Sequence, residues 1–170
     1  MDYLPIFLDV NDKKVLVDGG DTAAARRVER ALSAGAHVHV FCPKMSGEFR
    51  TLRDHPRVTH HLRAPEPADL EGCVIAYGAS EDEARDERLY EMAKAAKVLV
   101  NVADVTQYCD FITPSIVDRS PIVVAISSGG TAPVIARILR ARIEVMLPAA
   151  YGRLAAFVGG FRDRVMAKLK

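Results

Sequence analysis

The feature that most restricts the fold of this chain is a regular alternation between short apolar runs and segments of helical spacing. The runs are rich in β-branched residues. They cover positions 15–17, 37–41, 73–77, 98–102 and 122–126. Because their apolar residues are mostly consecutive, most of these runs are expected to be buried parallel strands. A weaker run at 58–61 is expected to be an additional strand at an edge of the sheet.

Segments of helical spacing separate the runs. In the first of them, Ala24 and Val28 repeat on one face, and Gly35 is expected to end the helix. In a later one, Ser80 and Glu83 have the spacing of a capping box, so that helix is expected to begin at Ser80. Helices between parallel strands form βαβ units, so we expect an α/β fold with a Rossmann-like parallel sheet.

Composition excludes several classes of protein. With 49% hydrophobic and 26% charged residues, the chain has the composition of a globular domain. Its net charge of +1 gives no global basic field, so no nucleic-acid partner is expected. No apolar run approaches the roughly 18 residues that cross a bilayer, and the N-terminus lacks a signal segment, so we expect a cytoplasmic protein with no membrane partner. The 3 cysteines lack C-x-x-C spacing and are expected to be free thiols.

The first strand is followed by a glycine turn that opens a helix, and the turn reads Asp18-Gly19-Gly20-Asp21-Thr22. The dinucleotide fingerprint has glycines here, which let the backbone approach a diphosphate at the helix N-terminus. In one alignment Asp21 stands at the middle glycine, where its carboxylate would crowd and repel phosphates. Shifting the alignment by one residue restores that glycine but loses the first. Two interpretations stay open: a dinucleotide site, and a turn that only joins strand to helix.

Two further strand ends bear on such a site. Where dinucleotide sites usually have a ribose-binding carboxylate, this chain has Phe41-Cys42-Pro43-Lys44, so backbone groups would bind the ribose, or Lys44 a phosphate. Past the run at 98–102, Asp104 lies where strand ends face the ligand crevice, which suits acid–base chemistry. A turn-forming or helix-capping aspartate explains Asp104 equally well.

The last long helix is expected to be apolar over more than half of its circumference. It follows a turn at 127–133. Its apolar residues are Val134, Ile135, Ile138, Leu139, Ile143 and Met146. One face of a small sheet does not cover so broad a surface, so a second subunit is expected to do so.

Several motifs together resemble one family. They are the opening Leu4-Pro5-Ile6-Phe7-Leu8, the Gly19-Gly20 turn, Asn101-Val102-Ala103-Asp104, the segment 109–121 and the segment 125–133. In this order and spacing they resemble the precorrin-2 dehydrogenase and siroheme synthase family over residues 1 to about 150. The resemblance implies NAD-dependent oxidation of precorrin-2 to sirohydrochlorin, followed in many members by insertion of Fe²⁺ to give siroheme.

The resemblance also implies a division of the chain and a set of site residues. Residues 1–113 would form the Rossmann NAD-binding domain, 114–147 the dimerisation segment of a homodimer, and 148–170 a truncated helical tail. Asp104 would be the catalytic proton acceptor and a transient Fe²⁺ ligand. The residues expected to bind NAD are Gly19, Gly20, Asp21, Thr22, Phe41, Pro43, Ala79, Asn101 and Val102. Those expected to bind the tetrapyrrole substrate are Ser127, Ser128, Gly129, Gly130, Thr131, Arg119 and Arg137.

The first turn departs from the family pattern. The family has three consecutive glycines there, and an ungapped match puts Asp21 on the third of them. Two alternatives follow from this. The chain could be a ferrochelatase or tetrapyrrole-binding protein that has lost NAD binding through Asp21, or a non-catalytic nucleotide-sensing module.

Overall fold

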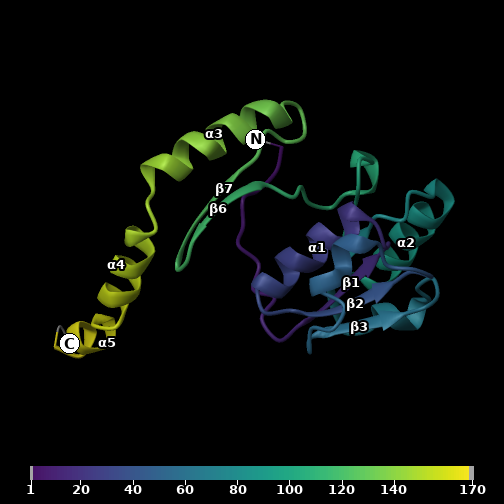
Figure 1. Ribbon diagram of the computed structural model, residues 1–170, viewed down its shortest axis with the longest axis horizontal. Coiled ribbons are helices and arrows are strands. Elements are labelled where there is room, and N and C mark those ends of the chain that lie inside the picture. The colour runs from purple at the N-terminus through teal and green to yellow at the C-terminus, as the bar shows by residue number, and fades with distance from the viewer. Residues whose placement is uncertain (1, 169–170) are drawn as a thin grey trace. The chain divides into compact units, whose positions relative to one another are not determined.

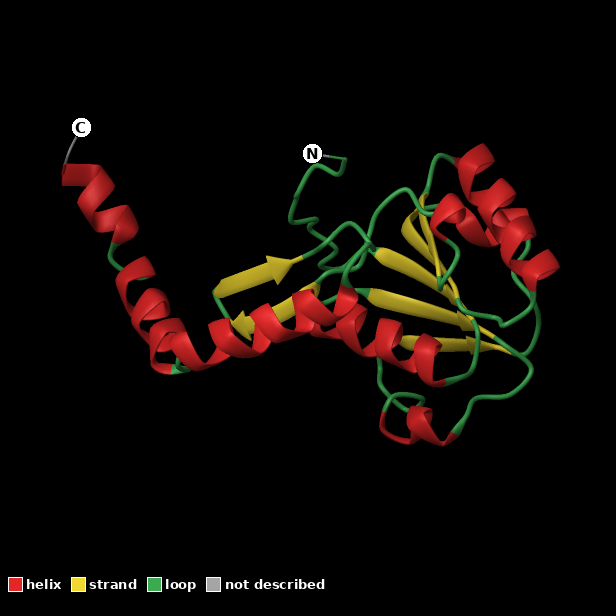
Figure 2. Cartoon of the chain, turned by 90° about the horizontal axis from the view of Figure 1, so that it is seen from above, coloured by secondary structure: helices red, strands yellow, loops and turns green. Residues whose placement is uncertain are grey.

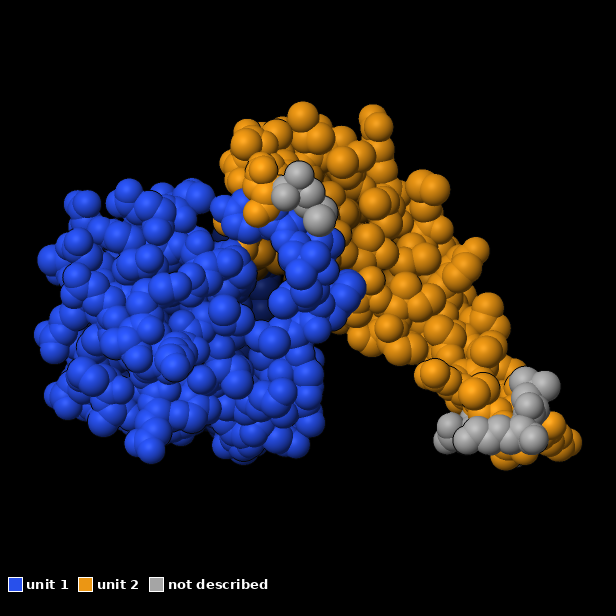
Figure 3. Space-filling model, turned by 180° about the vertical axis from the view of Figure 1, so that it is seen from behind, with its two compact units in different colours: residues 1, 3–111 blue, residues 2, 112–170 orange. Residues whose placement is uncertain are grey.

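The computed structural model describes residues 2–168, which divide into two compact units (Figures 1 and 3). The first unit contains residues 3–111 and the second begins at Ile112. Within the described residues, no helix is both long and apolar enough to cross a membrane. The expected functional division at residues 113 and 147 stays a prediction.

The first unit has a five-stranded parallel sheet with strand order β3-β2-β1-β4-β5. The strands are β1 (Lys14–Asp18), β2 (His37–Phe41), β3 (Val58–His61), β4 (Cys73–Gly78) and β5 (Leu99–Val102). The helices are α1 (Thr22–Ser33) and α2 (Glu83–Ala96), with 3-10 helices η1 (Gly47–Thr51), η2 (Pro67–Leu70) and η3 (Thr106–Tyr108). The prediction of a Rossmann-like α/β fold is confirmed, and β3 lies at an edge as expected.

Side chains that alternate along the strands form two buried clusters, one on each face of the sheet. On one face, Val15 and Val17 pack with Val28 of α1. On the other, Leu16 packs with Leu89 of α2. Both faces are therefore covered, which is why these strands read as apolar runs in the sequence.

One of the five apolar runs lies outside the parallel sheet, and the predicted start of α2 is wrong. The run at 122–126 is not part of the parallel sheet: β7 (Ile122–Ile126) pairs antiparallel with β6 (Ser115–Arg119). Only Ser120 and Pro121 join these strands, and parallel pairing needs a much longer crossover. In addition, α2 is capped by Asp82 and not by Ser80, because Glu81 adopts a left-handed φ of 60° and turns the chain before the helix begins.

β5 is the last strand at one edge of the sheet, and the segment that follows it covers this edge. Asn101 and Cys109 form an isolated antiparallel bridge. The Asp110 backbone amide donates to the Val100 carbonyl at 2.8 Å, and the Val100 amide donates to the Asp110 carboxylate at 3.1 Å. This segment is thus hydrogen-bonded along the edge strand.

The second unit contains the β6–β7 hairpin followed by α3 (Pro133–Met146), α4 (Ala150–Gly159) and α5 (Arg162–Lys168) (Figures 1 and 2). Arg119 joins the hairpin to the end of α3, since its Nε donates to the Leu147 carbonyl at 2.9 Å and its Nη2 lies 3.5 Å from Glu144. Gly152 packs so closely on the carbonyl of Arg119 that a Cβ would overlap it.

Replacing Leu89 with alanine tests the packing of α2 on the sheet. Leu89 is fully buried, so Leu89→Ala is expected to lower the free energy of unfolding by about 2–5 kcal/mol. Leu62 is 73% exposed, and Leu62→Ala, the same chemical change, is expected to cost less than about 0.5 kcal/mol. Urea denaturation measures both, and equal losses would show that α2 does not pack as described.

Candidate cofactor site

The strand order places a ligand crevice at the ends of β1 and β4. The chain leaves β1 toward β2 on one side, while β4 lies on the other, and ligands of open α/β sheets bind where the order reverses in this way. A cavity of about 470 Å³ lies at this point, within the range of small-molecule sites, which is roughly 300–1,000 Å³. Its lining residues are Gly19, Gly20, Asp21, Cys42, Pro43, Lys44, Met45, Ser46, Ser80 and Arg85.

The glycine turn is packed tightly between two neighbouring strand ends. A Cβ at Gly19, which has a φ of 147°, would overlap the carbonyl of Ala79. A Cβ at Gly20 would overlap the carbonyl of Lys44. The close packing of the fold therefore requires glycine at both positions. The backbone of the turn lies directly at the cavity.

Asp21 does not fill the turn. Its backbone is extended, and its carboxylate accepts a hydrogen bond from the Ala24 amide at 2.9 Å, which makes it the N-cap of α1. Asp21 nevertheless lines the cavity. Its negative charge therefore lies at the N-terminus of α1, the helix end that would attract a diphosphate.

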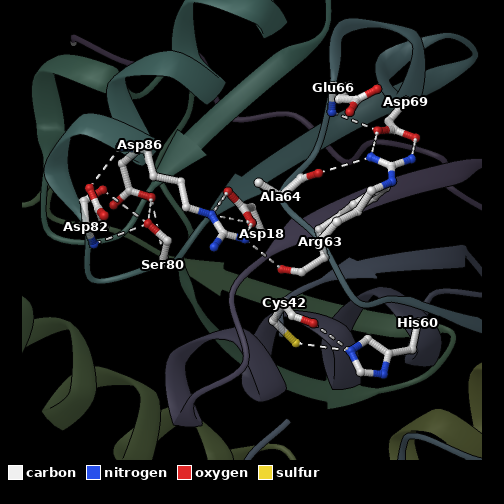
Figure 4. A network of polar contacts seen from close by, with 12 residues as sticks. Asp18, Cys42, His60, Arg63, Ala64, Glu66, Asp69, Ser80, Asp82 and Asp86 are labelled. Carbon is white, nitrogen blue, oxygen red and sulfur yellow. Dashed lines mark hydrogen bonds and ion pairs between the residues drawn. The ribbon is translucent and has the colours of Figure 1, made fainter. Parts of the chain in front are cut away.

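An ion pair that the sequence analysis missed lies beneath the turn (Figure 4). Asp18 at the end of β1 is fully buried, and the Nε and Nη2 atoms of Arg85 in α2 both donate to its carboxylate. Burial raises the pKa of Asp18, against the opposing effect of Arg85, whereas the hydrogen bonds to Asp18 raise the pKa of Arg85. These residues are far apart in sequence. The only signal for the pair is a carboxylate that directly continues the apolar run at 15–17.

Ser80 and Asp86 extend this polar network. The Ser80 hydroxyl donates to the Asp86 carboxylate at 2.8 Å, and the Asp82 amide donates to the Ser80 hydroxyl at 3.2 Å (Figure 4). The side chains before α2 are therefore held in place beside the cavity, which Ser80 lines.

Cys42 has a structural environment. Its sulfur lies 3.3 Å from Nε2 of His60, which also lies 2.9 Å from the Cys42 carbonyl (Figure 4). Burial raises the pKa of the Cys42 thiol, so the thiol stays protonated. His61 lies on the opposite face of β3, where it stacks on Phe41. Among residues 2–168, no group of three or more His, Cys, Asp and Glu side chains could hold a metal ion.

The loop after β2 carries a carboxylate that the sequence analysis also missed. A hydrogen bond from its own backbone amide is the largest cause that lowers the pKa of Glu48. A second cavity of about 330 Å³ shares Met45 and Ser46 with the first. It is lined by Met45, Ser46, Gly47, Arg50 and Arg53.

The other expected NAD-binding residues contribute to packing in this structure. Phe41 and Val102 are core residues, and Ala79 supports the turn. Asn101 is buried, and its amide nitrogen donates to the Phe111 carbonyl at 2.9 Å, while its oxygen lies 3.4 Å from Arg27. None of these four side chains is among those that line the cavity, and their cofactor contacts stay predictions.

Asp104, the expected proton acceptor, is exposed in the turn after β5. Its φ of 59° lies in the left-handed region, which non-glycine residues adopt rarely and aspartate more often than most. The carboxylate is not packed in the interior and is available for chemistry. Its catalytic role stays a prediction.

The expected tetrapyrrole-binding residues lie in the second unit. Ser127 to Thr131 form the turn between β7 and α3, and the Ser128 hydroxyl accepts a hydrogen bond from the Ala132 amide at 3.0 Å. Arg119 is bound to Leu147 and Glu144, whereas Arg137 is exposed. The tetrapyrrole contacts of both arginines stay predictions.

Comparisons with known proteins identify the family. A family model described as "Putative NAD(P)-binding" matches residues 6–115. The chain belongs to this NAD(P)-binding family. A second model, described as "Sirohaem biosynthesis protein central", matches residues 119–146. The resemblance found in the sequence is confirmed.

Curated relatives named siroheme synthase cover nearly the whole chain. The protein of Nitrosococcus oceani is 44% identical over 99% of this chain, and that of Thiobacillus denitrificans is 48% identical over 97%. The chain spans only 36% and 34% of the lengths of these two relatives. A solved structure titled "SirC, precorrin-2 dehydrogenase" has the same fold, with a TM-score of 0.81, 23% identity and coverage of 94% of this chain and 79% of that one.

Replacing Asp21 with asparagine tests the effect of its charge on the cofactor site. Asparagine caps helices as well as aspartate does, so Asp21→Asn is expected to leave stability unchanged while tightening NAD binding by about 2–5-fold. Asp21→Ala removes the cap as well and is expected to cost about 1 kcal/mol of stability. Calorimetric titration with NAD and thermal unfolding measure the two effects. Weaker binding by Asp21→Asn would show that the carboxylate itself contacts the cofactor.

Proposed function

We propose that this chain catalyses NAD-dependent oxidation of precorrin-2 to sirohydrochlorin in siroheme biosynthesis. The observation that carries this proposal is the open cavity at the Gly19-Gly20 turn, at the point of the sheet where dinucleotides bind. The relatives named siroheme synthase supply the substrate class. One alternative is that Asp21 blocks NAD binding. The open cavity argues against it, because the carboxylate of Asp21 is turned toward the Ala24 amide.

The chain's own residues have two tasks in this reaction. Oxidation of the reduced macrocycle removes a hydride and a proton, and NAD, when bound, supplies the hydride acceptor. The backbone of the Gly19-Gly20 turn and the N-terminus of α1 bind and orient the cofactor's diphosphate. Asp104, exposed at the carboxyl end of β5, accepts the proton.

Insertion of Fe²⁺ into the product is a second reaction that we propose for this chain. It would remove two protons from pyrrole nitrogens, and Asp104 could accept them in turn. Iron would be a substrate that the macrocycle binds, and Asp104 its transient ligand. A chelation assay with Fe²⁺ and sirohydrochlorin, run with the variants described next, would test this step separately.

Replacing Asp104 with asparagine tests the proton acceptor. Asparagine tolerates the left-handed backbone at this position, so Asp104→Asn is expected to fold and bind NAD normally. Its kcat for NADH formation with precorrin-2 is expected to fall by about 10²–10⁴-fold, the usual contribution of a positioned base. Asp54→Asn, at an exposed carboxylate away from the cavity, is the matched control and should leave kcat unchanged. An unaltered kcat in Asp104→Asn would refute the assignment, and no NADH from the unmodified chain would refute the function.

We further propose that the second unit forms a homodimer through residues 114–147. On α3, Val134, Ile135 and Ile138 are 55%, 58% and 49% exposed. Clustered apolar side chains of this size on a monomer's surface commonly mark an interface. A second copy of the chain offers a surface of the same apolar chemistry, as symmetric dimers do.

Replacing Ile138 with glutamate tests this interface. A charge in an apolar contact cannot be hydrated or paired there, so Ile138→Glu is expected to convert the dimer into a monomer. Ile138→Leu keeps the apolar surface and is expected to remain dimeric. Light scattering coupled to gel filtration measures the mass of each variant. A monomeric unmodified chain, or a dimeric Ile138→Glu variant, would contradict the proposal.

A further inference from the structure

A buried charge pair borders the cofactor cavity at the end of β1. Asp18 is fully buried and directly precedes the glycine turn. A carboxylate removed from water is costly, and a partner offsets the cost only when the geometry is good. Arg85 provides that geometry, because two of its nitrogens bond one carboxylate.

The contacts with Asp18 determine which nitrogen of Arg85 is left for another partner. Its Nε and Nη2 atoms bond Asp18, and Nη2 also donates to the Phe41 carbonyl at 3.2 Å. Both of these partners are fully buried. The Nη1 atom takes no part in these bonds, and Arg85 lines the cavity together with Gly19 and Gly20. The Nη1 edge of the guanidinium is therefore the one left for a ligand.

The charges around the cavity show why an anionic ligand would gain affinity from a bond to Arg85. Asp21 and Lys44 line the cavity with opposite charges, so they offset one another. Asp18 lies below, and the carboxylates of Asp82 and Asp86 also act on it. Without Arg85, a phosphate at the glycine turn would face these carboxylates with Lys44 as the only lining cation among the cavity residues.

We propose that Arg85, held in place by Asp18, binds the diphosphate of the dinucleotide cofactor. Its planar fork suits this task, since one edge bonds a carboxylate while the other is free to bond phosphate oxygens. The arrangement compensates for Asp21 at the glycine turn by adding a fixed cation to the lining of the cavity. The inference rests on the proposed function only in requiring a dinucleotide as cofactor.

Two ligands separate a diphosphate contact from a general effect on the site. ADP-ribose contains the diphosphate, whereas adenosine lacks it. In the Asp18→Asn/Arg85→Gln double variant, which leaves no buried carboxylate unpaired, the Kd for ADP-ribose is expected to rise by about 10–100-fold, the value of a charge-assisted hydrogen bond. The Kd for adenosine is expected to stay within about 2-fold of its original value. Calorimetric titration measures both.

Two single variants complete the experiment. Asp18→Asn keeps Arg85 and removes its countercharge, so it is expected to bind ADP-ribose at least as tightly as the unmodified chain. Arg85→Lys keeps the buried charge paired but loses the fork, so it is expected to bind ADP-ribose more weakly and adenosine unchanged. This variant decides the matter if the double variant does not fold.

The outcomes distinguish this inference from the proposed function. Unchanged ADP-ribose affinity in both Arg85 variants, or equal losses for ADP-ribose and adenosine, would overturn it and leave the pair as a structural contact between α2 and β1. Arg85-dependent ADP-ribose binding by a chain that oxidises no precorrin-2 would support the inference and refute the function. Absence of ADP-ribose binding by the unmodified chain would refute both.

Discussion

The structure of the site depends on the close approach of three backbone segments at the carboxyl edge of the sheet. The Gly19-Gly20 turn touches the carbonyl of Ala79 on one side and that of Lys44 on the other, and neither contact leaves room for a side chain. This approach sets where α1 begins and where the loop after β2 must pass. The cavity lies at the turn, whose position is fixed by these backbone contacts.

Electrostatics then decides what the cavity can accept. A helix N-terminus favours an anion, but Asp21 already bonds one of the free amides there. Asp18 adds a second negative charge close by, and Arg85 neutralises it within the protein. The balance between these groups, and not the glycines alone, determines the affinity for a diphosphate. A chain can thus keep the turn of a dinucleotide site while its charge pattern differs from the usual one.

The sequence predicts the parallel sheet because its strands are covered on both faces, which makes their apolar runs continuous. It does not predict the pairing of 122–126, because an apolar run has the same appearance in a hairpin and in a parallel sheet. The glycine turn and the position of Asp104 also follow from the sequence. The role proposed for Arg85 does not, since it depends on a contact made across the fold. The sequence also misplaces the cap of α2, because a single left-handed residue, Glu81, shifts the start of the helix.

The segment 109–111 has a consequence for the behaviour of the chain at high concentration. An uncovered edge strand offers its amides and carbonyls to any other strand that meets it, and this is a common route to aggregation. Here Asp110 occupies both the amide and the carbonyl of Val100. The polypeptide therefore blocks intermolecular sheet extension at β5 with its own continuation, and Asp110 acts as a gatekeeper against self-association through this edge.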